Sequence, residues 1–186
     1  DKTHTVVLDK TGTVTTGMPT VTDYLPAEGV TEETLLSAAY ALERRSEHPL
    51  AKAILRAGEE RGMTAGEVTD FTALTGSGLR ATRAGRTLLG GNRGLMEESG
   101  LQIPPALSEA AGRLADQGKT PLYFAEDGTL LGVIAVADVL KEESPQAIRE
   151  LKDMGIRVVM LTGDNPQTAN AIGRAAGVDE VIAGVL

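Results

Sequence analysis

Two short polar motifs in this 186-residue chain follow apolar runs, and each motif carries an aspartate. The first motif consists of Asp9, Lys10 and Thr11, and the second consists of Thr162, Gly163 and Asp164. A carboxylate can attack a phosphoryl group and hold it as an acyl phosphate, while a Thr hydroxyl and backbone amides bind the transferred oxygens and Mg²⁺ offsets their charge. The motifs therefore indicate phosphoryl transfer, whereas a lone aspartate after a strand is more often a turn or helix cap.

Three short apolar runs predict the strands that position these motifs. The runs TVVLD, LGVIAVAD and IRVVMLTGD are continuously apolar, which predicts buried strands. Between the last two, Ser144 is expected as an N-cap, Pro145 at the first helical position and Gly155 just past the helix end. Strand, helix and strand in this order predict a parallel sheet, at whose edge Asp9 and residues 162–164 face one crevice.

The middle of the chain has a different pattern of elements. Helical periodicity and turn residues predict helices over 31–46, 49–62, 104–118 and 165–177, and hairpins over 79–91 and 120–133. These elements predict an α/β sheet domain, residues 1–20 and 127–186, into which an α+β domain, residues 21–126, is inserted.

Composition excludes several classes of partner. With 18 basic and 26 acidic residues the formal charge is -8, which disfavours non-specific binding to nucleic acid or anionic lipid. Cysteine is absent, so disulfides and thiolate metal sites are excluded. The longest apolar stretch, residues 130–137, is far shorter than the roughly 20 residues that cross a bilayer, so we expect a soluble chain.

The motifs DKTGTVTTG (9–17), SEHPLAKAI (46–54) and TGDNPQTA (162–169) resemble, in this order, those of P-type ATPases. The second of them is typical of the heavy-metal-transporting subgroup, and the overall run of residues looks closer to copper pumps than to zinc or cadmium pumps. The resemblance covers essentially the whole chain. It implies a haloacid-dehalogenase-like sheet domain with a nucleotide-binding domain inserted after the first strand.

The resemblance also implies roles for the polar motifs. ATP would phosphorylate Asp9, the carboxylate of Asp9 and the backbone carbonyl of Thr11 would bind Mg²⁺, and Thr162 would bind the phosphoryl oxygens. Lys10 would lie beside the nucleophile, and residues 163–164 would shape the facing loop. Phosphatases of the superfamily usually carry a second Asp two positions after the nucleophile, where this chain has Thr11, so an acyl phosphate should persist.

Six residues of the insert match the adenine-binding residues of the subgroup: Glu43, His48, Gly76, Gly78, Gly91 and Asn92. A neutral imidazole can stack on or hydrogen-bond to a purine, Glu43 can accept from the exocyclic amine, and glycines allow close backbone approach. His48 could instead start a helix beside Pro49, and the glycines could form hairpin turns. A dinucleotide fingerprint at residues 76–81 is disfavoured, because no βαβ unit begins there.

A complete pump of this family also needs membrane helices, an actuator domain and a further catalytic segment with a lysine and a GDGxND loop. We find none of these and expect a soluble fragment from the cytoplasmic face of a membrane protein. It should bind ATP with modest affinity but not complete the transport cycle. The alternatives are a free-standing phosphatase and a non-catalytic nucleotide-binding module. Asp138 could lie near the phosphorylation site or cap a strand or helix.

Overall fold

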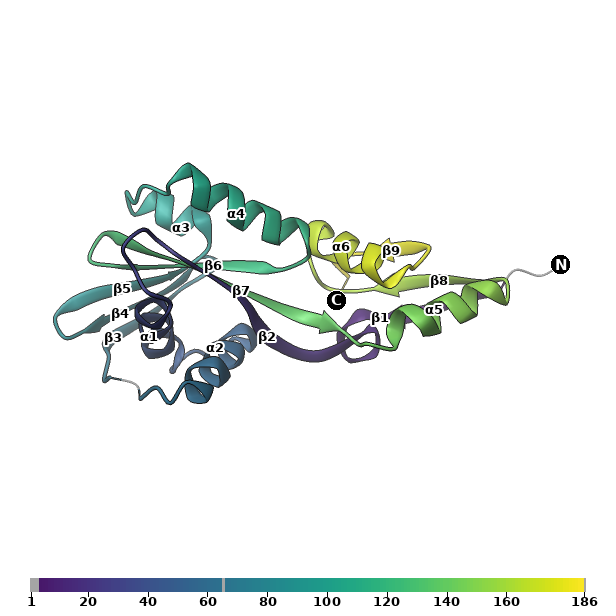
Figure 1. Ribbon diagram of the computed structural model, residues 1–186, viewed down its shortest axis with the longest axis horizontal. Coiled ribbons are helices and arrows are strands. Elements are labelled where there is room, and N and C mark those ends of the chain that lie inside the picture. The colour runs from purple at the N-terminus through teal and green to yellow at the C-terminus, as the bar shows by residue number, and fades with distance from the viewer. Residues whose placement is uncertain (1–3, 65, 186) are drawn as a thin grey trace. The chain divides into compact units, whose positions relative to one another are not determined.

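A computed structural model describes residues 4–64 and 66–185 and divides the chain into two compact units (Figure 1). The first unit comprises Asp1–Pro19, Leu114–Thr120 and Ala137–Leu186; the second comprises Thr20–Arg113 and Pro121–Val136. The predicted insert, residues 21–126, differs from the second unit at three places, of which the smallest is Thr20, which groups with the second unit. Residues 114–120 group with the first unit, and residues 127–136 group with the second.

The first unit contains a parallel sheet with the strand order β1-β8-β9. Its elements are β1 (His4–Asp9), the turn η1 (Lys10–Val14), α5 (Ser144–Asp153), β8 (Ile156–Leu161), α6 (Pro166–Ala176) and β9 (Glu180–Ile182). Val158 and Met160 of β8 pack with Ile148 of α5 and Ile172 of α6 in one core. Asp9 pairs with Leu161, so both polar motifs begin at the same edge of the sheet, as predicted.

Strand β1 was predicted to be buried, and this is wrong. Leu8 packs against the core of the first unit, but Val7 is 58% exposed. Successive side chains of a strand point to opposite faces, so only one face of β1 is covered by the described residues. The continuous apolar run predicts a strand correctly, but it does not reveal which faces the rest of the fold covers.

The second apolar run, β7 (Thr129–Leu140), was predicted to lie in the parallel sheet, and this is also wrong. It lies in the other sheet, between β2 (Thr15–Pro26) and β6 (Thr120–Glu126). Asp127 and Gly128 both have positive φ and form a two-residue turn between β6 and β7. A turn this short makes consecutive strands pair as a hairpin, so β7 follows β6 rather than joining β8.

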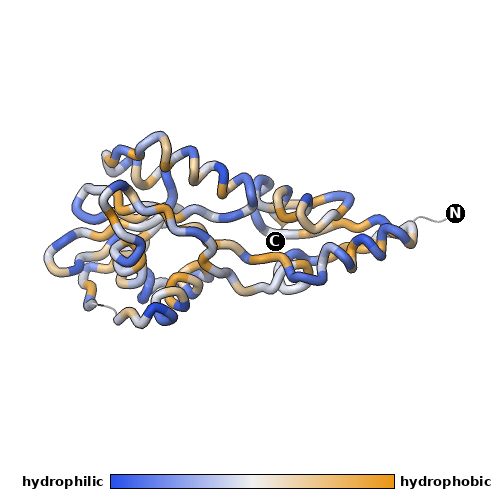
Figure 2. The backbone as a smooth tube through the Cα atoms, viewed as in Figure 1, coloured by the Kyte–Doolittle hydropathy of each residue, from blue (hydrophilic) through white to orange (hydrophobic). Residues whose placement is uncertain are grey.

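The second unit is built on a six-stranded sheet with the order β2-β7-β6-β5-β4-β3. Its remaining elements are α1 (Glu32–Glu43), α2 (Pro49–Glu60), β3 (Thr69–Leu74), β4 (Gly78–Arg83), β5 (Arg86–Gly91), α3 (Arg93–Glu98) and α4 (Pro105–Asp116). Helices α1 and α2 cover one face of the sheet, and α3 and α4 cover the other (Figure 1). Hydrophobic stretches of the chain follow the strands between them (Figure 2).

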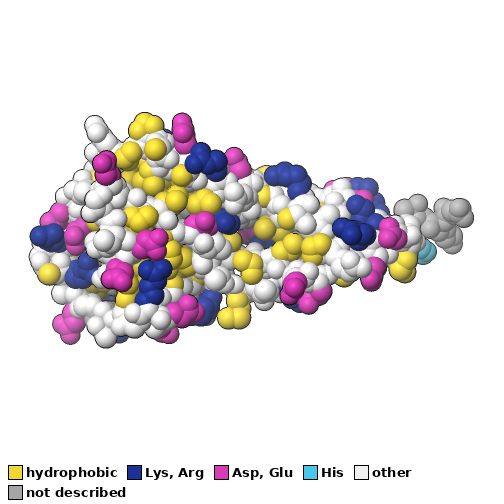
Figure 3. Space-filling view, in the orientation of Figure 1, with side chains coloured by type: hydrophobic (Ala, Val, Ile, Leu, Met, Phe, Trp, Pro, Cys, Tyr) yellow, Lys and Arg dark blue, Asp and Glu magenta, His cyan; other side chains and the backbone are white. Residues whose placement is uncertain are grey.

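Successive side chains of β6 point to opposite faces of this sheet and pack into different cores. Phe124 packs into the core beneath α1 and α2, whereas Tyr123 and Ala125 pack into the core beneath α3 and α4. Coverage on both faces explains why residues 130–137 of β7 are continuously buried, because each face of the strand meets a core. On the molecular face in Figure 3, acidic side chains are interspersed with basic ones. No helix of the described residues is long and apolar enough to span a bilayer.

Several predicted helix ends are confirmed, whereas the start of α5 and the end of α1 differ from the prediction. Thr31 caps α1, with its Oγ1 accepting from the backbone N–H of Thr34 at 3.1 Å, and Gly177 closes α6 with a φ of 86°. Ser144 was predicted as an N-cap but lies inside α5. Its buried hydroxyl instead donates to the backbone carbonyl of Val14 at 2.7 Å, which ties α5 to the turn η1.

Candidate functional site

The turn after β1 is held by a buried lysine. The Nζ atom of Lys10 lies 2.7 Å from Oδ2 of Asp164 and 3.7 Å from Oδ2 of Asp138, and Lys10 is only 5% exposed. The approach to Asp164 is close but not aligned as a hydrogen bond, so the contact is ionic. A buried ammonium needs such partners because its desolvation is costly. Lys10 thus joins both polar motifs to β7.

Asp138 lies beside the first polar motif rather than capping a helix. Its Oδ2 accepts from the hydroxyl of Thr15 at 2.5 Å, and its Oδ1 accepts from the backbone N–H of Gly17 at 2.9 Å. These contacts, together with the ion pair to Lys10, place Asp138 beside the motif that begins at Asp9. Thr15 is fully buried, and sequence reasoning did not assign it a role.

Asp9 stands apart from this network. It is exposed at the end of β1, and its carboxylate makes no hydrogen bond or ion pair with the described residues. Thr162 is buried one position past the strand partner of Asp9, and its Oγ1 accepts from the backbone N–H of Asp164 at 3.1 Å. The structure therefore presents one accessible carboxylate next to an ordered loop.

The metal prediction of Asp9 and Thr11 is compatible with these surroundings. Among the described residues, no cluster of three or more His, Cys, Asp or Glu side chains could hold a metal ion. Mg²⁺, however, is commonly bound through one or two protein oxygens, with water and substrate phosphates as its other ligands. An unpaired Asp9 carboxylate and a nearby backbone carbonyl fit that kind of site.

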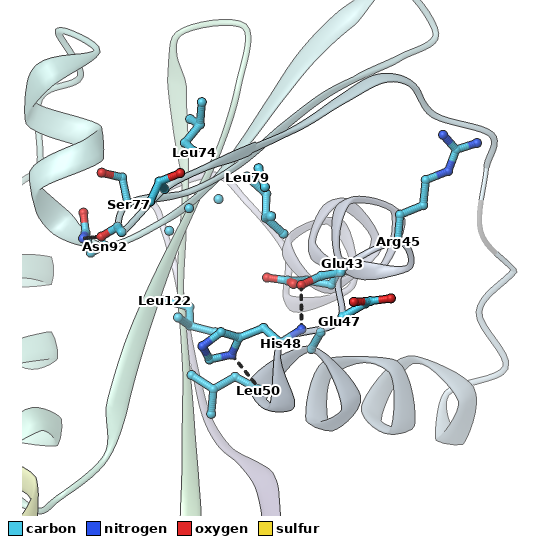
Figure 4. A pocket seen from close by; sticks show the side chains of 18 of the residues that line it. Glu43, Arg45, Glu47, His48, Leu50, Leu74, Ser77, Leu79, Asn92 and Leu122 are labelled. Atoms are coloured by element: carbon cyan, nitrogen blue, oxygen red, sulfur yellow. Dashed lines mark hydrogen bonds between the residues drawn. The ribbon is translucent and has the colours of Figure 1, made fainter. Parts of the chain in front are cut away.

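The second unit contains a pocket of about 660 Å³ (Figure 4). A volume of this size is typical of small-molecule sites. Apolar side chains supply much of the lining, among them Leu50, Phe71, Leu74, Leu79 and Leu122. The pocket is also lined by all six residues predicted to bind nucleotide, which are Glu43, His48, Gly76, Gly78, Gly91 and Asn92. The fold thus brings together residues that lie up to 49 positions apart in the chain, from Glu43 to Asn92.

Glu43 is the last residue of α1 and is only 8% exposed. Burial raises the pKa of its carboxyl group from the ordinary 4.5 to about 7. The side chain makes no hydrogen bond or ion pair with the described residues. Desolvation disfavours the charged form of an acid, so this carboxyl group holds its proton up to near-neutral pH.

His48 caps α2 and also faces the pocket (Figure 4). Its Nδ1 accepts from the backbone N–H of Leu50 at 3.2 Å. In the neutral ring the proton then resides on Nε2, which is left as a donor. The helix-start role and the binding role are therefore compatible, because each uses a different ring nitrogen.

The pocket glycines are required for different structural reasons. Gly78 and Gly91 are paired residues of β4 and β5, and a Cβ on Gly78 would lie 2.0 Å from the carbonyl oxygen of Gly90. A Cβ on Gly91 would lie 2.1 Å from the carbonyl oxygen of Ser77, so both glycines are needed for strand pairing. Gly76 has a φ of 73° and open space around it, so only its backbone conformation favours glycine.

Asn92 connects two walls of the pocket. Its Oδ1 accepts from the backbone N–H of Leu95 at 2.9 Å and so caps α3. Its Nδ2 donates to the backbone carbonyl of Gly76 at 3.2 Å. The side chain thereby holds the loop before β4 against the end of β5, and the sequence predicted its place in the pocket but not this bracing role.

A parallel sheet ending in an aspartate, with a second unit inserted after that strand, is the arrangement that the sequence resemblance implied. The chain belongs to the haloacid dehalogenase-like hydrolase family, whose model matches residues 3–186. The predicted fold class is thereby confirmed.

The chain is similar to curated copper-transporting ATPases. The chain is 45% identical over 181 residues to the copper-transporting ATPase 1 of Rhizobium meliloti (strain 1021), a match covering 97% of this chain and 22% of the relative. It is 44% identical over 189 residues to the copper-exporting P-type ATPase of Staphylococcus aureus (strain JH9), covering 100% of this chain and 23% of the relative. The chain thus spans about a fifth of the length of the curated relatives it matches.

Solved structures agree with these relatives. A zinc-transporting PIB-type ATPase in its E2.Pi state superimposes with a TM-score of 0.82 at 36% identity, covering 100% of this chain and 30% of that one. The N-domain of a copper-transporting P-type ATPase gives a TM-score of 0.54 at 27% identity, covering 64% of this chain and 98% of that one. The predicted resemblance to heavy-metal P-type ATPases is confirmed.

Proposed function

We propose that this chain is the ATP-binding and phosphorylation part of a copper-transporting P-type ATPase. ATP binds in the pocket of the second unit, and Asp9 of the first unit receives the γ-phosphoryl group. The observation that carries the proposal is that six residues matched to the adenine site of this subgroup line a single pocket of suitable size.

The pocket residues bind and orient the nucleotide. His48 donates from Nε2 to a ring nitrogen of the base, since its Nδ1 is already engaged by Leu50. The apolar lining excludes water from the base, which strengthens the few polar contacts there. Gly76 brings backbone close to the ligand without a side chain, and Asn92 holds that loop in place.

Asp9 supplies the nucleophile for phosphoryl transfer. A carboxylate oxygen of Asp9 attacks the γ-phosphorus, and the bond from that phosphorus to the bridging oxygen breaks, so ADP leaves with the electron pair. Lys10 does not pair with Asp9, because Asp138 and Asp164 already engage it. Thr11 offers no general acid or base at neutral pH, so the acyl phosphate is long-lived.

When it is bound, Mg²⁺ offsets the negative charge on the oxygens of the transferred phosphoryl group. The carboxylate of Asp9 and the backbone carbonyl of Thr11 would hold it, together with water and phosphate oxygens. Thr162 and the backbone of residues 163–164 would face the same phosphoryl group from the neighbouring strand. Asp164 keeps its present role, holding Lys10 in place.

For the whole protein we propose the partners that its relatives imply. These are a transported metal ion, copper being favoured by the names of the curated relatives, and membrane-spanning and actuator domains. This chain would then act at the cytoplasmic face of the membrane. We do not propose a nucleic-acid partner, because the net charge of -8 opposes one.

The test is a calorimetric titration with ATP, ADP and AMP, with and without Mg²⁺. We expect ATP to bind the wild-type chain. His48→Ala should weaken ATP binding by about 10-fold, which corresponds to the loss of one hydrogen bond between neutral groups in an apolar site. The matched control is His4→Ala, the same change at the other histidine of the chain, which lies on β1. A folded wild-type chain that binds no nucleotide would refute the proposal and favour the phosphatase alternative.

Phosphorylation of Asp9 is a separate test. Incubation with ATP labelled at the γ-phosphate, followed by acid quenching, traps an acyl phosphate if one forms. We propose the long-lived acyl phosphate for the whole protein and expect no stable labelling of this chain alone, because Asp9 and the backbone carbonyl of Thr11 are its only proposed Mg²⁺ ligands. Labelling that disappears in Asp9→Asn would show instead that the chain is competent for the first chemical step.

A further inference from the structure

The carboxyl group of Glu43 enters the pocket without a counter-charge. The other titratable groups lining the pocket are Arg45, Glu47 and His48, all from the segment between α1 and α2. Figure 4 shows the side chains of Arg45 and Glu47 directed away from Glu43. The lining residues of β3, β4, β5 and β6 are apolar or glycine, so no strand brings a charge to Glu43.

Ionisation of a carboxyl group in these surroundings is costly. An isolated carboxylate in an apolar environment loses its hydration and gains no partner, so the neutral acid is favoured. The pKa of Glu43, raised to about 7 by burial, agrees with this geometry. Both protonation states are therefore accessible near neutral pH, and they have different hydrogen-bonding groups.

We propose that Glu43 recognises adenine while its own side chain is a neutral carboxylic acid, which donates a hydrogen bond to N1 and accepts one from the N6 amino group. This inference rests on the proposed nucleotide site. A protonated carboxyl group has one O–H donor and one carbonyl acceptor, which match the acceptor N1 and the donor N6 of adenine side by side. The ionised carboxylate has acceptors only, so it keeps the contact to N6 but opposes the lone pair of N1.

Guanine responds differently to the same ionisation. It presents the N1–H and N2–H donors next to each other, and a carboxylate can accept from both. The ionised form of Glu43 therefore matches guanine and mismatches adenine. Selectivity for ATP over GTP should fall as the pH rises through neutrality, and ATP binding at alkaline pH should take up a proton from solvent.

The size of the effect follows from the population of the neutral form. If only that form binds adenine, the apparent dissociation constant is the intrinsic one divided by the neutral fraction. That fraction falls about 10-fold between pH 6 and pH 8 for a group that titrates near pH 7. We expect ATP affinity to fall about 10-fold over this range and GTP affinity not to fall.

The experiment is isothermal titration calorimetry of the full chain with ATP and with GTP from pH 5.5 to pH 8.5, in HEPES and in Tris. Two buffers with different heats of ionisation give the number of protons taken up. We expect almost none at pH 5.5 and nearly one per ATP at pH 8. The terminal phosphate of ATP titrates too, so the comparison that counts is between wild type and variants.

Glu43→Gln is the decisive variant, and Glu33→Gln is its matched control. A glutamine amide offers a donor and an acceptor at every pH, so Glu43→Gln should bind ATP at pH 8 about 10-fold more tightly than wild type and should lose the proton uptake. Glu33 is an exposed residue at the other end of α1, and its change to Gln should leave the wild-type profile intact.

Each outcome bears on the inference. The proposal would be overturned if the affinity for ATP were constant or rose with pH, or if Glu43→Gln bound ATP more weakly than wild type at pH 8. Either result would show that the ionised carboxylate of Glu43 contacts adenine, and the proposed nucleotide site itself would stand. Absence of ATP binding at every pH by a folded chain overturns the nucleotide site and this inference with it.

Discussion

Glu43→Gln should make the nucleotide-free chain more stable at alkaline pH, although it alters a residue of the binding pocket. In the unfolded chain the carboxyl group of Glu43 regains its ordinary pKa of 4.5, whereas burial raises the pKa to about 7 in the folded chain. Between these two values the folded chain holds a proton that the unfolded chain has lost. The contribution of Glu43 to the free energy of unfolding therefore falls as pH rises from 4.5 to 7, and this contribution is level outside that window.

The magnitude follows from the same two pKa values. Each tenfold change in proton affinity corresponds to about 1.4 kcal/mol, so ionised Glu43 costs the wild type about 3 kcal/mol above pH 7. The side chain is only 8% exposed, so solvent screening reduces this cost little. Gln has nearly the same shape and no charge. The difference in unfolding free energy between Glu43→Gln and wild type should grow from near zero at pH 4 to about 3 kcal/mol at pH 8.

Urea unfolding followed by tyrosine fluorescence measures this difference. The three tyrosines, Tyr24, Tyr40 and Tyr123, all belong to the second unit, so the signal reports on the unit that contains Glu43. With a slope of about 2 kcal/mol per molar urea, the midpoint of Glu43→Gln at pH 8 should exceed that of wild type by about 1.5 M. A stability difference that is the same at pH 4 and pH 8 would refute the reasoning. Glu33→Gln should show no such dependence on pH.

Four further substitutions and one surface control test the packing of the pocket and of the turn that carries Lys10. Gly78→Ala should destabilise the second unit by about 3 kcal/mol or more, because its Cβ would force β4 away from β5. Gly76→Ala should cost only about 1 kcal/mol, because only the positive φ of this residue favours glycine. Equal midpoints of urea unfolding for the two variants would contradict this reasoning. Asn92→Ala should cost about 1 kcal/mol through the lost cap of α3, measured in the same way. Lys10→Met should cost about 3 kcal/mol, since it leaves buried carboxylate surface uncompensated, whereas Arg93→Met, which removes an exposed ion pair, should cost less than about 0.5 kcal/mol in circular dichroism unfolding curves.

Local chemistry in the sequence predicted much of this protein. Thr31 and Gly177 signalled helix ends because their side-chain oxygen and their conformational freedom act within one turn of the helix. The turn at Asp127 and Gly128 signalled a hairpin for the same reason. The residues of the nucleotide pocket were also predicted, although from a family resemblance rather than from spacing.

Long-range packing was beyond such reasoning. An apolar run indicates burial but not the neighbouring strand, so β7 was placed in the wrong sheet and the exposure of Val7 was missed. The contacts of Lys10 join segments that are 128 and 154 positions apart, Asp138 and Asp164. The pKa of Glu43 depends on how completely its surroundings exclude water, a property that exists only once helices and strands from across the chain have packed around it.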